Sequence, residues 1–235
     1  MSQPDRKHIT EFYDKYVNHQ LQKAYNVRHF MLFDELINFG LKEDSNVLEL
    51  GCGIGVITSM IGTYAHHGMT IGVDISPKSI KAAQKKVTLK NISFFAADIL
   101  EIDHTSKSFD FITLFDVMEH IPIDKHTNLF EQLAKHVSDD TKVIINIPNP
   151  SFIEYLHRHE SNKLQVIDQP VWADGLLGSA YKAGFVLKQF RTYDIWTEED
   201  YQLMLFQKKV HYQKIQLETA HLTLRNKIKR LLALD

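Results

Sequence analysis

The sequence has few of the features that mark an oxidising compartment or a bilayer. Among its 235 residues Cys52 is the one cysteine, so no disulfide can form within the chain. No stretch approaches the roughly 20 apolar residues that a membrane-spanning helix needs. The first residues also lack the basic and apolar segments of a secretory signal. We therefore expect a cytoplasmic protein without an integral membrane segment.

The chain also lacks an excess of either charge and any linker-like segment. Lys and Arg number 27 against 29 Asp and Glu, which gives a formal net charge of −2. No global field therefore favours nucleic acid, and we expect no nucleic-acid partner. Hydrophobic residues make up 44% of the chain, an ordinary globular share, and no Gly/Ser-rich or Pro-rich stretch divides it. The length fits one α/β domain with additions.

The first 40 residues have the apolar spacing of helices. Apolar and aromatic side chains recur three and four residues apart at Ile9, Phe12, Tyr13, Tyr16 and Val17. The same spacing continues over residues 30–37 and ends at Gly40, a typical residue just after a helix. We expect residues 1–40 to form an N-terminal helical cap.

From Asn46 to Lys208 short β-rich runs alternate with helical patterns, which is typical of a parallel sheet covered on both faces. The expected strands are 46–50, 70–74, 92–96, 110–115, 142–147, 185–193 and 201–208. Only a short polar stretch separates the last two, so they should be antiparallel. We predict a doubly wound α/β fold over residues 41–210, with a mostly parallel seven-stranded sheet, an antiparallel last strand and an insertion at about 149–170.

The strongest local signal is a buried strand that runs into a glycine-rich turn. Residues 47–55 read VLELGCGIG and are followed by a helical pattern. Glycines permit a tight turn and a close approach of a ligand, and the helix start offers free N–H groups. The dinucleotide fingerprint would need a third glycine at position 56, where Val56 stands. The turn therefore predicts a ligand site and disfavours a dehydrogenase.

Two segments carry a family resemblance. ELGCGIG at residues 49–55 and DVMEHIP at residues 116–122 resemble class I S-adenosylmethionine-dependent methyltransferases, of the type that modifies quinones and sugars. The resemblance implies a Rossmann-like methyltransferase fold, S-adenosyl-L-methionine (SAM) as cofactor and S-adenosyl-L-homocysteine (SAH) as product. It also implies cofactor contacts from the glycine turn and the acid before it, namely Glu49, Gly51, Cys52, Gly53 and Gly55.

Acidic residues end the next two strands. Asp74 is placed to accept the ribose hydroxyls of a nucleoside, or alternatively to cap the helix that follows. In the resembling family the later acid, here Asp98, accepts from the adenine amino group and Ile99 packs on the ring, with Ile75 on the same ligand. A solvated loop aspartate is the alternative for Asp98. Because the carboxyl ends of these strands meet at one edge, we expect a single crevice.

The resemblance extends to the segment after the fourth strand and to the N-terminal helices. It places Phe115 and Asp116 beside the sulfonium and the acceptor. In similar methyltransferases an N-terminal helix covers the cofactor, which implies that Tyr13 and Arg28 contact the cofactor and Tyr16 the acceptor. The alternative for these aromatic residues is an ordinary core stripe.

A general base is expected near the same edge. We predict methyl transfer to oxygen, less readily to nitrogen, of a small polar metabolite such as a sugar or glycan precursor. A hydroxyl is a poor nucleophile at neutral pH, and His120 is the best placed of 13 histidines to take its proton. Alternatively His120 bonds the backbone near Pro122 or reaches the cofactor carboxylate through a water. A further alternative for the whole chain is a catalytically inactive SAM-binding protein that acts through interaction.

The polar insertion at residues 151–170 is predicted to receive the acceptor, with Tyr155 and Trp172 as stacking surfaces and His157 and His159 as polar contacts. An exposed amphipathic helix explains most of the same pattern equally well. The histidine pair lacks partners at a recognised metal-site spacing, so no required metal is expected.

Beyond Lys208 an apolar stripe with basic residues predicts a C-terminal helix at residues 211–235. Packing on the body or on a second subunit, as a homodimer, is favoured because aromatic membrane anchors are sparse. The alternative is contact with an anionic membrane that carries a lipid-linked or quinone acceptor.

Overall fold

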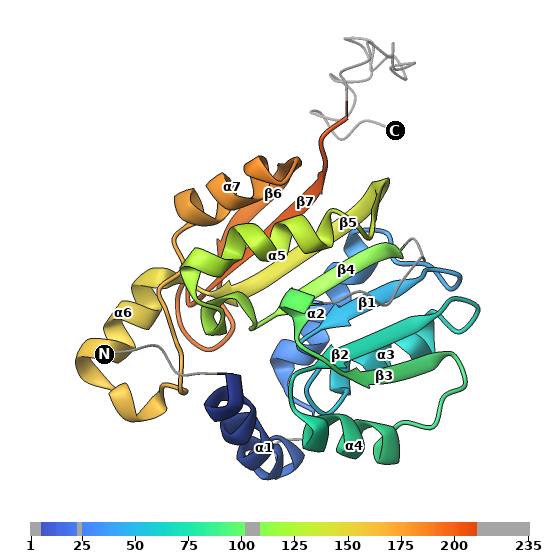
Figure 1. Ribbon diagram of the computed structural model, residues 1–235, viewed down its shortest axis with the longest axis horizontal. Coiled ribbons are helices and arrows are strands. Elements are labelled where there is room, and N and C mark those ends of the chain that lie inside the picture. The colour runs from blue at the N-terminus through green and yellow to red at the C-terminus, as the bar shows by residue number, and fades with distance from the viewer. Residues whose placement is uncertain (1–5, 23–24, 102–108, 211–235) are drawn as a thin grey trace, which may run out of the picture.

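The computed structural model describes residues 6–22, 25–101 and 109–210 (Figure 1). These residues form a seven-stranded sheet in the order β3-β2-β1-β4-β5-β7-β6. The strands are β1 Val47–Leu50, β2 Thr70–Asp74, β3 Ile92–Ala96, β4 Phe109–Phe115, β5 Val137–Pro148, β6 Phe185–Tyr193 and β7 Tyr201–Lys208. Pairs from β3 to β5 are parallel, and β7 is antiparallel to both β5 and β6. The predicted fold is confirmed.

Helices cover both faces of the sheet (Figure 1). The α-helices are α1 Arg6–Gln22, α2 Val27–Asn38, α3 Val56–Tyr64, α4 Pro77–Lys86, α5 His126–Leu133, α6 Pro150–His159 and α7 Ala173–Lys182. Short 3₁₀ turns are η1 Ile99–Glu101, η2 Met118–His120, η3 Ile123–Lys125 and η4 Ser161–Lys163. No helix within these described ranges is long and apolar enough to cross a bilayer.

Alternation along β4 builds two cores. Phe111 and Phe115 pack with α2 and α3 on one face, whereas Ile112 and Leu114 pack with α5 and α7 on the other. On the second face Phe130 of α5 is fully buried, which stabilises the fold by roughly 1.5–3 kcal/mol for one such side chain. Since both faces are covered, the central strands are mostly apolar, with Glu49 of β1 and Thr113 of β4 as buried polar residues among them.

The two N-terminal helices lie in different places. Helix α2 packs on one face of the sheet, with Leu32 and Leu36 fully buried against β1 and β4. Helix α1 lies across the carboxyl edge of the sheet next to α4 (Figure 1). There Asp14 accepts hydrogen bonds from the Ser76 hydroxyl at 2.6 Å and the Lys78 backbone N–H at 3.2 Å. The boundary at residue 40 stays a prediction, and the predicted helix at 211–235 lies outside the described residues.

The hairpin between β6 and β7 is closed by one carboxylate. Asp200 accepts from the backbone N–H groups of Ile195 at 2.7 Å and Trp196 at 3.0 Å.

Strand β5 begins five residues earlier than the 142–147 predicted, because the polar run before it joins the sheet through Thr141. The Thr141 hydroxyl donates to the Phe109 carbonyl oxygen at 2.6 Å. The outcome is a sheet whose carboxyl edge carries the site.

Candidate active site

A cavity of about 530 Å³ opens at the carboxyl ends of β1, β2 and β4, beneath α1. That volume is typical of a small-molecule site. Most of the residues predicted for the cofactor line it: Tyr13, Arg28, Glu49, Gly51, Cys52, Gly53, Asp74, Ile75, Asp98, Ile99, Phe115 and Asp116. Tyr16 and His120 line it as well, while Gly55 does not. The fold therefore brings together predicted residues that are up to 107 positions apart in the sequence, from Tyr13 to His120.

The glycine turn needs glycine for two separate reasons. Gly51, Gly53 and Gly55 have φ angles of 75°, 53° and 75°, a left-handed region that side chains disfavour. A Cβ on Gly51 would also lie 2.3 Å from Val117 Cγ2, and one on Gly55 would lie 2.7 Å from Phe94 Cζ. Gly55 thus supports the turn without lining the cavity. Helix α3 begins directly after it, and its first residues, Val56 and Ile57, line the cavity.

Asp74 fastens the glycine turn to the end of β2. Its carboxylate accepts from the Gly53 N–H at 2.8 Å and from the Ser76 N–H at 2.9 Å. Burial raises the pKa of Asp74, and these two donors oppose the shift. Ser76, rather than Asp74, caps α4, because the Ser76 hydroxyl accepts from the Ser79 N–H at 3.0 Å. Asp74 therefore orders the turn while lining the cavity.

Glu49 lies buried below the same turn. The Thr58 hydroxyl donates to its carboxylate. Burial raises the pKa of Glu49 to about 7, although the Thr58 bond opposes the shift. The group is therefore balanced between its neutral and charged forms near neutral pH.

Arg28 and Asp116 form an ion pair in the cavity wall. The capping box of Asn26 and His29 fixes the start of α2 and so presents Arg28. Asp116 follows β4 with a φ of 54°. Its Oδ1 atom is buried without a hydrogen-bond partner among the described residues. The sequence predicted both residues in the site but gave no sign that they pair.

His120, in η2, is held by carboxylates on two sides. Its Nδ1 lies 3.1 Å from Asp168 Oδ1 and 2.5 Å from the Ile167 carbonyl oxygen, and its Nε2 lies 3.8 Å from Glu119 Oε1. Burial lowers the pKa of His120, but the charges of Glu119 and Asp168 outweigh it and raise that pKa to about 9. Burial raises the pKa of Glu119 to about 8. The contacts of Nδ1 assign a proton to that nitrogen, directed at Asp168. Nε2 is then the ring nitrogen that takes part in neither contact.

The segment at residues 165–169 wraps around η2. The Gln169 N–H donates to the Glu119 carbonyl oxygen at 3.1 Å, and its side-chain amide donates to the Ile121 carbonyl oxygen at 2.9 Å. Asp168 in turn accepts from the Gln165 N–H at 2.5 Å. Sequence reasoning missed Asp168, because a contact 48 residues from His120 has no motif spacing. Its one signal was its place in the predicted insertion.

Several buried polar atoms around the cavity have no partner among the described residues. They include Tyr13 Oη, Gln20 Oε1, Asp116 Oδ1 and Gln165 Oε1, all on residues of the lining. The Tyr13 ring packs edge-on to His120, with centroids 5.9 Å apart, and burial raises its pKa. Unpaired buried polar atoms are rare in folded proteins. Their gathering here fits a cavity made for a polar ligand.

Arg6 was not among the predicted residues but lines the cavity next to two that were. Its guanidinium lies 3.5 Å from Asp98 and 2.9 Å from Glu101. These pairs join the start of α1 to the loop after β3. They are partly exposed, so each contributes little to stability.

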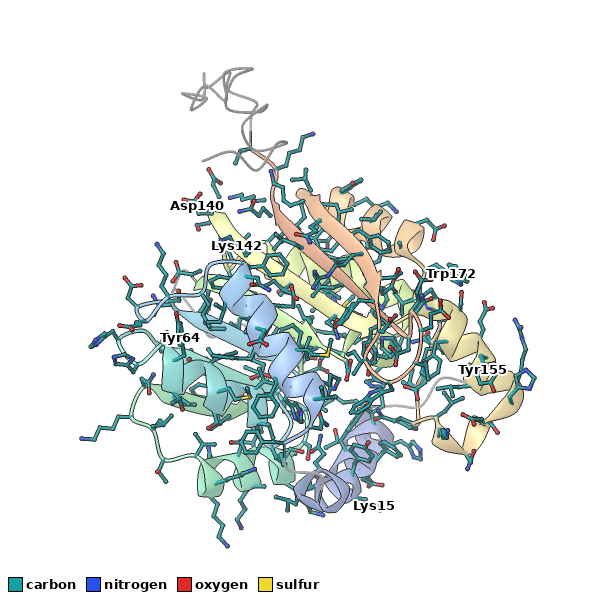
Figure 2. The ribbon with its side chains drawn as sticks, turned by 180° about the vertical axis from the view of Figure 1, so that it is seen from behind. Lys15, Tyr64, Asp140, Lys142, Tyr155 and Trp172 are labelled. Carbon is teal, nitrogen blue, oxygen red and sulfur yellow. The ribbon has the colours of Figure 1, made fainter. Side chains whose placement is uncertain are left out.

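Four predicted acceptor residues lie outside the cavity lining: Tyr155, His157, His159 and Trp172. Tyr155 and Trp172 are about half exposed, and Figure 2 places both at the outer edge of the molecule. His157 Nε2 lies 2.7 Å from the Asp168 carbonyl oxygen, and the His159 ring packs on Tyr155 at 4.7 Å. The structure thus does not bring these four residues to the same cavity as His120.

The sequence matches a family model described as "Methyltransferase domain" over residues 13–231. The chain therefore belongs to this methyltransferase family, which confirms the resemblance to class I SAM-dependent methyltransferases.

Two curated relatives are similar to half of the chain. A ubiquinone biosynthesis O-methyltransferase of Coxiella burnetii is 28% identical over 115 residues, 48% of this chain and 47% of the relative. A phosphoethanolamine N-methyltransferase of Plasmodium falciparum is 29% identical over 115 residues, 47% of this chain and 41% of the relative. The chain spans about half the length of the curated relatives it matches.

Among solved structures, the magnesium protoporphyrin IX methyltransferase of Synechocystis PCC 6803 with bound SAH has a TM-score of 0.69 at 15% identity. The match covers 88% of this chain and all of that one. At this identity the likeness shows the fold.

Proposed function

We propose that this chain binds SAM in the cavity and transfers its methyl group to an oxygen atom of a small polar acceptor. Family membership supports the reaction class. The observation that carries the proposal is the meeting of the glycine turn, Asp74 and His120 in one cavity. A nitrogen acceptor is the less favoured variant. An amine depends less on a general base than a hydroxyl does, so it would leave the position of His120 in the cavity unexplained.

The cavity residues fit SAM along its length. The glycine turn, with Glu49 below it, would hold the amino-acid end, where the free N–H groups at the start of α3 suit a carboxylate. Asp74 would accept the ribose hydroxyls, and Asp98 with Ile99 would hold the adenine. When bound, SAM supplies a methyl group activated by a positive sulfur. The protein then has to align the acceptor and exclude water.

His120 is proposed as the general base, with Asp168 as its positioning residue. Asp168 holds Nδ1, so Nε2 is the atom that takes the acceptor proton. The carboxylates of Glu119 and Asp168 raise the pKa of His120 and so favour its protonated form in the ligand-free protein. A further positive charge in the same cavity would lower that pKa and favour the neutral base. The unpaired Tyr13 Oη would contact the cofactor, as the resemblance implies, and the unpaired Gln165 Oε1 would bind the acceptor.

A quinone-type or lipid-linked phenol is the second candidate acceptor. Apolar residues Ile9, Leu100 and Ile121 line the cavity beside the polar ones. An aromatic ring bearing a hydroxyl would use both kinds of contact. Such a phenol needs less help from a base than a sugar hydroxyl does.

The test uses the full chain with methyl-labelled SAM and fractionated pools of polar metabolites and phenols. Binding is measured first by calorimetry, then the labelled product is isolated and its methyl carbon assigned by NMR to oxygen or nitrogen. An O-methyl product supports the proposal. SAM binding without turnover on any fraction would favour the alternative of an inactive binding protein. Absence of SAM binding would overturn the proposal altogether.

A further inference from the structure

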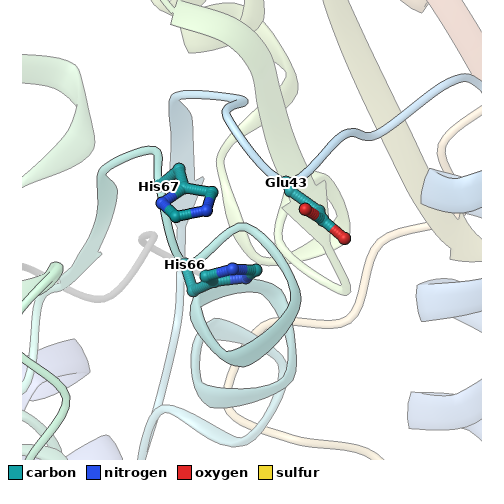
Figure 3. Close-up of side chains that lie close together, drawn as sticks. All are labelled: Glu43, His66 and His67. Carbon is teal, nitrogen blue, oxygen red and sulfur yellow. The ribbon is translucent and has the colours of Figure 1, made fainter.

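A second group of ligating side chains lies at the opposite edge of the sheet. Glu43 stands in the loop before β1, and His66 and His67 stand in the loop before β2 (Figure 3). One ligand atom from each lies within 4.8 Å of the other two, and all three side chains are exposed. Because both loops enter parallel strands, this cluster is at the amino edge, while the cavity is at the carboxyl edge.

The backbone holds the two loops together. The N–H groups of His67 and Gly68 both donate to the Glu43 carbonyl oxygen, at 2.9 Å and 3.2 Å. A Cβ at Gly68 would lie 1.9 Å from the Ser45 carbonyl oxygen, so the close approach depends on glycine. The cluster therefore sits on fixed backbone, and only side-chain rotation separates its present geometry from a closed one.

The histidines offer nitrogen atoms suited to a metal. His66 Nδ1 lies 2.9 Å from the Tyr64 carbonyl oxygen. A proton on Nδ1 directed at that carbonyl leaves the lone pair on Nε2, which is the usual arrangement of a metal-bound histidine. The His66 and His67 rings are neighbours with centroids 4.1 Å apart. Within the described part of the chain, no salt bridge to Glu43 competes for its carboxylate.

We propose that Glu43, His66 and His67 bind a divalent transition-metal ion of the Zn²⁺ type. Metal bonds of about 2.0–2.2 Å place the ligand atoms of a tetrahedral or octahedral site roughly 3–3.5 Å apart. Rotation of exposed side chains closes the difference from 4.8 Å. Two imidazoles and one carboxylate suit Zn²⁺, Cu²⁺ and Ni²⁺ better than Mg²⁺ or Ca²⁺. Water fills the remaining positions.

The bound ion acts as a clamp on the fold. It links the loop before β1 to the loop before β2, a geometry that the unfolded chain does not preform, so binding stabilises the folded state. The site does not take part in methyl transfer, because the length of β1 and β2 separates it from the cavity. It is also independent of the proposed function, which can fail without affecting it.

The experiment titrates the full chain with Zn²⁺ by calorimetry after chelator treatment, and measures the thermal midpoint with and without Zn²⁺. The double variant His66→Ala/His67→Ala should lose one equivalent of Zn²⁺ or raise its Kd at least tenfold, and it should lose the Zn²⁺-dependent rise in the midpoint. Glu43→Gln should weaken the same equivalent less.

His159→Ala is the matched control, since it removes an exposed histidine on α6 and should bind Zn²⁺ as the parent chain does. All substituted residues are exposed, so the midpoint in chelator should not move. A double variant that keeps the parent's stoichiometry, Kd and Zn²⁺-dependent midpoint would overturn the proposal. So would a parent chain without saturable Zn²⁺ binding.

Discussion

Arg28 of α2 and Asp116, the residue after β4, form an ion pair across the carboxyl edge of the sheet. The pair joins a helix of the N-terminal region to the strand that leads into η2, which carries His120. It also neutralises a carboxylate whose side chain is only 21% exposed. One oxygen of that carboxylate remains without a partner among the described residues, so the pair has capacity left for a ligand.

Arg28→Met should destabilise the protein by about 2–3 kcal/mol, because it leaves a largely buried carboxylate without its partner. Urea unfolding followed by circular dichroism measures the loss. The double variant Arg28→Met/Asp116→Asn should recover most of it, because no uncompensated charge then remains. A double variant as unstable as the single one would show that Arg28 acts by packing rather than by charge.

Gly51→Ala should cost roughly 1–2 kcal/mol for the left-handed backbone and further stability for the contact with Val117. It should also weaken SAM binding, since the turn must shift. Gly178→Ala is the control: it lies in α7, with nothing within 4 Å of the new Cβ, and should stabilise the helix by up to about 1 kcal/mol. Equal effects of the two substitutions would contradict the proposed role of the turn.

The features that the sequence predicts are those that depend on residues close together in the chain. The turn at residues 51–55 and the strand at 70–74 were predictable, because glycine conformation and apolar runs are local properties. The pairing of Arg28 with Asp116 was not, since it depends on how α2 docks. The same limit explains the missed Asp168, which meets His120 only when the segment at 165–169 folds back over η2.

Glu49→Gln should flatten part of the pH dependence of stability. The pKa of Glu49 is about 7 in the folded protein and 4.5 without burial. The native state therefore binds this proton more tightly. The contribution of Glu49 to stability is fully present below pH 4.5 and is lost as the pH rises through about 7. That loss amounts to up to roughly 3 kcal/mol.

Urea titrations at pH 5 and pH 7.5 test this expectation. The parent chain should lose more stability between the two conditions than Glu49→Gln does, because the amide does not ionise. Glu131→Gln on the exposed face of α5 is the control and should behave as the parent does. If the parent and Glu49→Gln lose equal stability, Glu49 does not titrate in this window.

Asp168→Asn should lower kcat more than it changes KM, because Asp168 orients His120 without needing to touch the acceptor. It should also lower the pKa of His120 from about 9, since one of its two raising charges is removed. The acidic limb of the kcat/KM profile then moves to lower pH, while the plateau falls.

Two measurements check the role of Asp168: the pH profile of methyl transfer and an NMR titration of the His120 ring. Glu160→Gln, a partly exposed residue of the same insertion that is paired with Lys163 and lies outside the cavity lining, is the control and should leave both unchanged. A variant with reduced kcat but an unshifted His120 titration would argue that Asp168 supports the loop and not the imidazole.

The antiparallel direction of β7 has a practical consequence. Strands β1, β2 and β4 end at the cavity, but β7 runs from Tyr201, opposite Pro148, back toward Phe206, opposite Val143. The last described residue, Val210, therefore lies toward the amino edge of the sheet, opposite the carboxyl edge that carries the cavity. A reporter protein fused after Val210 would therefore begin at the edge of the sheet opposite the cavity. Such a fusion should leave the cavity open to cofactor and acceptor.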